Sequence, residues 1–221
     1  MMSPASLWWR LVRFGFRLLY NELAFTYDLV SWVVSMGAWR CWQRAALSFL
    51  PEVGTGCILE VAHGTGNLHL DLRQAGYDVV GVDFSPYMGQ ITRRKFAKRG
   101  QRAILVQAKA QSLPFENGSM QAIICTFPTS FIFESATLQE FYRVLEPDGR
   151  FVIVLNGVFV SGGFIRRALE WAFRVTGQRS EPDTDYAADV RAQLTGYGFE
   201  AIRQHDVACP RSVAQIIVVK K

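Results

Sequence analysis

Residues 58–67, ILEVAHGTGN, determine the fold expected for this chain. The apolar run at residues 57–62 predicts a buried strand, and the small residues Gly64, Thr65 and Gly66 follow it directly. Residues 68–74 then have the pattern of a helix. A strand, a glycine loop and a helix in this order form the first half of a βαβ unit, which is the building block of a parallel sheet.

The rest of the chain continues the same alternation. Further strands are expected at residues 79–82, 103–107, 122–127 and 151–155, with helices at 86–98 and 136–145. Two last strands are expected at 199–207 and 213–219. The connection Cys209-Pro210-Arg211 is too short for a parallel crossover, so these two strands should form an antiparallel hairpin. The sequence therefore predicts the α/β class with a doubly wound, mostly parallel sheet.

Ligands of open α/β sheets bind at the carboxyl ends of the strands, where this sequence places two distinctive groups. The loop Gly64-Thr65-Gly66 allows backbone N–H groups to approach a ligand at a helix N-terminus. Asp83, at the tip of the second strand, can accept both hydroxyls of a ribose. Together they indicate nucleoside binding; the alternative is a glycine turn with Asp83 capping the next helix. His69 occupies the third position of the dinucleotide fingerprint G-x-G-x-x-G, which disfavours a nicotinamide-dependent oxidoreductase.

Four stretches resemble the motifs of the class I S-adenosylmethionine-dependent methyltransferases, in particular the group with quinone-biosynthesis and phospholipid N-methyltransferases. They are ILEVAHGTGNLHLDL, GYDVVGVDFSPYM, AQSLPFENGSMQAI and LQEFYRVLEPDGRFVIV. The resemblance implies a Rossmann-like sheet of seven strands with an antiparallel last strand, and S-adenosylmethionine as cofactor, released as S-adenosylhomocysteine. The implied cofactor-binding residues are Tyr27, Glu60, Ala62, His63, Gly64, Thr65, Gly66, Asp83, Phe84, Ser85, Met88, Ala110, Gln111 and Thr126.

Within that set, the resemblance implies distinct contacts. Glu60 and the glycine loop would approach the methionine part and the sugar, and Asp83 would bind the ribose. Phe84 and Met88 would flank the adenine, and Ala110 and Gln111 would reach its amino group. Tyr27 would close over the amino acid end of the cofactor. Thr126 would border the methyl-transfer site. Ala62, His63, Lys109 and Gln121 depart from the family's usual residues. Methyl transfer from a sulfonium depends mainly on alignment, so no catalytic residue is assigned.

The composition fits one folded domain with an appendage. The chain has 221 residues, of which 50% are hydrophobic and 19% charged, which excludes the disordered and fibrous classes. Residues 1–50 are expected to form an N-terminal amphipathic helical lid, and residues 51–221 the cofactor-binding domain with a helical insertion at about 158–180. The four cysteines are far apart without a C-x-x-C pair, so we expect no disulfide framework, no metal site and a reducing cytosol.

The net charge of +5 is concentrated in two aromatic segments. Residues 1–50 contain five arginines against Glu22 and Asp28, and residues 158–179 contain four arginines against Glu170; the remainder sums to −1. Arg10, Arg13 and Arg17 would share one face of a helix, a pattern typical of interfacial helices, although such a helix can also pack on its own domain. Charges interrupt every apolar run before it reaches the length of a membrane span.

These features predict a methyltransferase acting on a lipid-like acceptor, either a phospholipid headgroup or a quinone precursor. The two aromatic segments would admit the acceptor from the inner face of the membrane, and the enzyme would be cytoplasmic. A soluble acceptor under a closed lid and a non-catalytic, methyltransferase-like binding protein are the alternatives. No nucleic-acid partner is expected, since the strand at 122–127 is followed by TFPTSF and not by N-P-P-Y, and no basic patch was found outside the aromatic segments.

Overall fold

The computed structural model describes residue 15 and residues 23–160 and 186–221. Its centre is a seven-stranded sheet of order β3-β2-β1-β4-β5-β7-β6. Arg10, Arg13 and Arg17, and residues 161–180 of the expected insertion, lie outside the described residues.

Five strands run parallel, and helices connect them in chain order except between β3 and β4, which a loop joins. They are β1 (Cys57–Val61), β2 (Asp78–Asp83), β3 (Leu105–Gln107), β4 (Met120–Thr126) and β5 (Leu145–Phe159). The helices that connect or cover them are α4 (Asn67–Gln74), α5 (Pro86–Ala97), η3 (Ser130–Phe133) and α6 (Ser135–Val144). Apolar runs in the sequence thus identified each parallel strand, and the alternation with helices made the sheet parallel.

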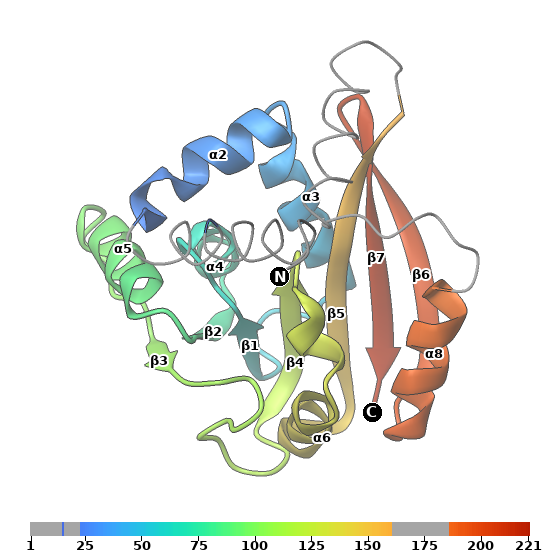
Figure 1. The fold of residues 1–221 in the computed structure, drawn as a ribbon. Helices are drawn as coiled ribbons and strands as arrows, with labels where there is room; N and C mark the ends of the chain where they lie inside the picture. Colours follow the sequence, from blue (N-terminus) through green and yellow to red (C-terminus); the bar gives the residue numbers. More distant parts are fainter. Residues whose placement is uncertain (1–14, 16–22, 161–185) are drawn as a thin grey trace, which may run out of the picture.

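The sheet ends in the expected antiparallel hairpin. β6 (Glu200–Cys209) pairs antiparallel with β7 (Ser212–Lys220), and β7 pairs antiparallel with β5. β5 is longer than the predicted 151–155 because it pairs with β7 as far as Phe159. The prediction missed α8 (Tyr186–Gly196), which lies against β6 (Figure 1) and whose sequence, YAADVRAQLTG, contains few large apolar residues.

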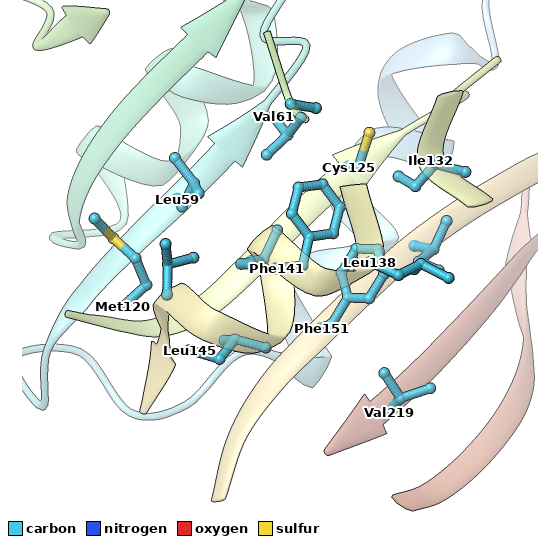
Figure 2. Packing of buried hydrophobic residues seen from close by; sticks show 14 of the residues in the cluster. Leu59, Val61, Met120, Cys125, Ile132, Leu138, Phe141, Leu145, Phe151 and Val219 are labelled. Carbon is cyan, nitrogen blue, oxygen red and sulfur yellow. The ribbon is translucent and has the colours of Figure 1, made fainter. Parts of the chain in front are cut away.

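Two hydrophobic clusters hold the helices on opposite faces of the sheet. On one face, Leu138 and Phe141 of α6 lie over Cys125 and Phe151, with the two phenylalanine rings 5.0 Å apart and edge to face (Figure 2). α8 adds Val190 and Leu194 to this cluster. These side chains are almost completely buried, so the layer is a close-packed core of the doubly wound kind.

The opposite face is covered by α4 and by helices that precede β1. Between residue 23 and β1, the helices are η1 (Ala24–Thr26), α2 (Tyr27–Val34), α3 (Trp39–Ala45) and η2 (Ala46–Phe49). Trp42 lies flat on β5, since a Cβ added to Gly157 would come within 2.2 Å of the indole ring. The Trp42 indole N–H also donates to Ser212 Oγ at 2.9 Å. α3 is therefore part of the core of the sheet domain.

The expectation of no disulfide was wrong. Cys41 of α3 and Cys209 of β6 form a disulfide, with Cα atoms 6.0 Å apart although the residues are 168 positions apart in the sequence. Spacing in the sequence gave no sign of this pair, because only the docking of α3 on the C-terminal hairpin brings the residues to bonding distance. Cys57 and Cys125 are free.

No helix among the described residues is both long enough and apolar enough to cross a membrane.

Candidate functional site

The polar and glycine-rich segments expected at the site meet at the carboxyl edge of the sheet. β1, β2 and β4 run in parallel and end at this edge, below α2 in Figure 1. The loop 62–66 follows β1, Asp83 ends β2 and Thr126 ends β4. Three segments far apart in the sequence are thereby brought to one place.

The glycine loop uses backbone conformations that favour glycine. Gly64 and Gly66 have φ values of +54° and +73°. A Cβ on Gly66 would lie 2.3 Å from Thr92 Cγ2 of α5, so only glycine lets the loop approach that helix. A Cβ on Gly64 would meet nothing within 4 Å, which leaves open space beside the loop for a ligand. Ala62 is also left-handed, with φ +55°, where the family usually has glycine.

Asp83 is held in place and still able to accept hydrogen bonds. Its Oδ2 accepts from the Gly64 N–H at 2.9 Å, and its Oδ1 accepts from the Ser85 N–H at 2.8 Å. A carboxylate offers about four acceptor positions, so each oxygen keeps capacity for one further donor. The side chain is half-buried beside the glycine loop. This geometry suits a pair of ribose hydroxyls.

Residues after β2 form the next part of the site. Ser85 caps α5 by accepting from the Met88 N–H, and Pro86 occupies the first turn. The Phe84 ring is exposed, with the Lys109 ammonium 5.6 Å from its centroid. Lys109 therefore has a cation–π partner in place of the polar contact that the family's aspartate would make. Met88 is buried under this surface.

Ala110 is buried, and the side chain of Gln111 forms a hydrogen bond away from the glycine loop. The Gln111 side-chain amide donates to Glu134 Oε2 at 2.7 Å.

Glu60 is directed into the core. Its Oε2 lies 2.8 Å from Nδ1 of His69, and both side chains are buried. His69 Nε2 has no hydrogen-bond partner among the described residues. His63 is likewise buried, with its Nδ1 2.9 Å from the Gly64 carbonyl oxygen. Both histidines therefore serve to hold the loop, α4 and β1 together, and neither faces open space.

α2 closes over the glycine loop through Asp28, which the sequence did not mark as a site residue. Asp28 accepts from Thr65 Oγ1 at 2.5 Å, from Asn67 Nδ2 at 2.9 Å and from Lys95 Nζ at 3.1 Å. Burial lowers the pKa of the Lys95 ammonium below its usual value, and Asp28 partly offsets that effect. The one signal in the sequence for this role was that Asp28 is a single acidic residue in an otherwise uncharged stretch, residues 23–37.

Aromatic rings cluster beside Thr126 at the end of β4. We call Tyr27, Trp39, Trp42 and Phe127 the aromatic wall. Trp39 packs on Phe127 with ring centroids 4.0 Å apart, and Tyr27 contacts Trp39 edge to face at 6.3 Å. Phe127 has φ +52°, an unusual conformation for a bulky residue, and such strain is concentrated at functional sites.

Gln43 stands between this wall and β4. Its Nε2 lies 3.4 Å from Thr126 Oγ1, while its buried Oε1 has no partner among the described residues. A buried acceptor of this kind costs free energy unless a ligand or water donates to it.

Comparison with known proteins finds relatives for the central part of the chain. Residues 58–149 match the methyltransferase domain family. The demethylmenaquinone methyltransferase of Thermus thermophilus is 39% identical over 139 residues, covering 62% of this chain and 63% of that protein. The chain thus spans about three fifths of the length of the first curated relatives it matches.

Solved structures share the fold. A [4+2]-cyclase, SpnF, aligns with a TM-score of 0.64 and 15% identity over 90% of this chain and 93% of the other. A protein described as an S-adenosylmethionine-dependent methyltransferase from Methanococcus maripaludis aligns with a TM-score of 0.61 and 18% identity, again over 90% of this chain and 93% of the other. Because one fold carries both descriptions, the reaction must be argued from the site.

Proposed function

We propose, given that this chain contains a class I S-adenosylmethionine-dependent methyltransferase domain, that it transfers a methyl group from that cofactor to a lipid-like quinone precursor. The observation that carries the choice of acceptor is the aromatic wall beside Thr126, built on the strained Phe127. Flat rings favour stacking with another flat ring, such as that of a quinol. The relative from Thermus thermophilus, by its name, acts on demethylmenaquinone.

The chain's own residues fit the cofactor. Asp83 would accept the two ribose hydroxyls, and the open side of Gly64 would admit the sugar and methionine part. Phe84 would flank the adenine. When bound, the cofactor supplies an electrophilic methyl group on a sulfonium.

Residues around Thr126 would orient the acceptor. Gln43 Oε1 would accept a hydrogen bond from a hydroxyl of the acceptor ring, which satisfies the buried oxygen. The aromatic wall would hold the ring in line with the methyl group and exclude water. In balance, the acceptor would gain the methyl carbon and release a proton to solvent, and the electron pair of the broken carbon–sulfur bond would stay on sulfur, giving S-adenosylhomocysteine.

The location we propose is the inner face of the cytoplasmic membrane, where an acceptor with a long apolar tail resides. In a reducing compartment, Cys41 and Cys209 would be held as thiols at the same positions. We also propose that residues 1–50 and about 158–180 cover the acceptor.

The test is incubation of the purified protein with methyl-labelled S-adenosylmethionine and a membrane extract, followed by phase partition. Label in the organic phase is expected, and Asp83→Ala should abolish it together with binding of S-adenosylhomocysteine. Trp39→Leu should reduce transfer while S-adenosylhomocysteine still binds. Label confined to the aqueous phase would refute the lipid-like acceptor, and cofactor binding without any transfer would favour a non-catalytic role.

A further inference from the structure

α2 has its polar and apolar faces reversed relative to an ordinary surface helix. Between Leu23 and Gly37 the only charged residue is Asp28, and it points inward to Thr65 and Lys95. Ser31 and Ser35, on the same side of the helix, are buried. The polar side of the helix therefore faces the protein.

The outward side of the same segment is apolar. Phe25, Leu29 and Trp32 are 73%, 63% and 62% exposed, and Val33 and Met36 continue the stripe. These five residues, which we call the α2 apolar face, recur at helical spacing. Single exposed apolar residues are ordinary, but a contiguous group of this kind marks an interaction surface.

A basic surface lies next to the α2 apolar face. The stretch 84–115 contains seven Lys and Arg residues and no Asp or Glu, a concentration that the charge count over whole segments concealed. Arg93, Arg94, Lys98 and Arg99 of α5 and its C-terminal end are exposed. α5 lies beside the start of α2 (Figure 1), and the ion pair between Lys95 and Asp28 joins the two helices at 3.1 Å.

We propose that the α2 apolar face and the exposed basic residues of α5 form a docking surface for an anionic lipid bilayer. Apolar side chains insert below the headgroups while lysine and arginine attract the anionic phosphates. A second copy of the chain is disfavoured as the occupant, since a two-fold contact on this face would bring two basic helices together. A nucleic acid would use the charge and leave the apolar face without a role.

The docking surface lies where the proposed reaction would need it, but docking on a membrane does not depend on that reaction. Through Asp28, the inward side of α2 contacts the glycine loop, so docking would place the carboxyl edge of the sheet toward the bilayer. Flotation measures docking without any turnover. A failure of methyl transfer and a failure of docking are therefore separately observable.

The experiment is flotation of the full chain with vesicles of phosphatidylcholine alone or mixed with phosphatidylglycerol. We expect binding to the anionic vesicles only, and its loss when salt is raised from about 0.1 M to 1 M, which shortens the Debye length from about 10 to 3 Å. Phe25→Gln with Trp32→Gln should lower the partition coefficient at least about tenfold. Arg94→Gln with Lys98→Gln should lower the partition coefficient by about twenty-five-fold, at roughly fivefold per charge.

Matched controls separate this surface from general effects. Val53→Gln removes an exposed apolar side chain at the opposite edge of the sheet, and Arg191→Gln with Arg203→Gln removes two exposed charges from α8 and β6. Both should bind vesicles as the parent does, and circular dichroism should show that all variants fold. Absence of flotation at low salt, or equal losses in the controls, would overturn the proposal. So would a dimer that dissociates on Phe25→Gln with Trp32→Gln, or salt-sensitive RNA binding without vesicle binding.

Discussion

Replacing Gly66 by alanine should destabilise the protein much more than the same change at Gly64, two residues earlier in the same loop. Both glycines have positive φ, so both variants pay a left-handed backbone cost of about 1–2 kcal/mol, reduced by about 0.4–1 kcal/mol through the stiffer unfolded chain. Gly66→Ala also places a methyl group 2.3 Å from Thr92 Cγ2 and 2.6 Å from its Oγ1. Such overpacking adds about 1–3 kcal/mol.

The expected losses of unfolding free energy are therefore about 1 kcal/mol for Gly64→Ala and about 2–4 kcal/mol for Gly66→Ala. Urea denaturation followed by circular dichroism measures both. Truncating the Thr92 side chain provides the decisive comparison. Thr92→Ala alone loses the hydrogen bond to the Gly64 carbonyl oxygen and should be destabilising. Combined with Gly66→Ala, it should be less destabilising than the sum of the two single changes, by a coupling energy of about 1 kcal/mol or more. Equal losses at the two glycines, or additive effects in the double variant, would refute the close contact between loop and helix.

Three further changes probe other parts of the structure. Ala62→Gly should raise the unfolding free energy by up to about 1 kcal/mol, because glycine accepts its φ of +55°; a lower urea midpoint would contradict this. Cys41→Ser should lower the unfolding free energy under oxidising conditions by up to about 5 kcal/mol, the loop-entropy value for a separation of 168 residues. In reductant the same change should have little effect. Thermal melts with and without dithiothreitol measure both. Asp71→Asn should cost about 1–3 kcal/mol, because the buried carboxylate accepts hydrogen bonds from the partly exposed Arg40 and Arg44 and fastens α3 to α4; a loss below about 0.5 kcal/mol in urea would mean that these bonds are dispensable.

The sheet was predictable from the sequence because each parallel strand is a short apolar run that ends in a turn signal. β1 and β4 appear almost at their observed bounds, and the connection at 209–211 gave the direction of the final hairpin. α8 escaped prediction because, among its residues with described side chains (190–196), Val190 and Leu194 are the deeply buried ones, too few to give a helical period. Tertiary packing, not local pattern, fixes that helix.

The site was predictable only where its members follow strands. Asp83 and the glycine loop were identified in this way. Asp28, Gln43 and the wall residues Tyr27, Trp39 and Trp42 come from helices before β1, and their positions depend on how α2 and α3 dock on the sheet. The left-handed Phe127 could not be inferred either, since residue type argues against that conformation. The resemblance placed Glu60 near the cofactor, whereas the structure pairs it with His69 in the core.

The bond between Cys41 and Cys209 makes a ring of the chain that contains the whole sheet except β7. A protease that cuts the backbone once inside this ring opens it without releasing a fragment, so the cut protein would migrate as one species until reductant is added. The ring also bears mechanical load. A pull applied to the two ends would pass from α3 to β6 through sulfur, and the parallel strands would remain unstretched while the bond holds.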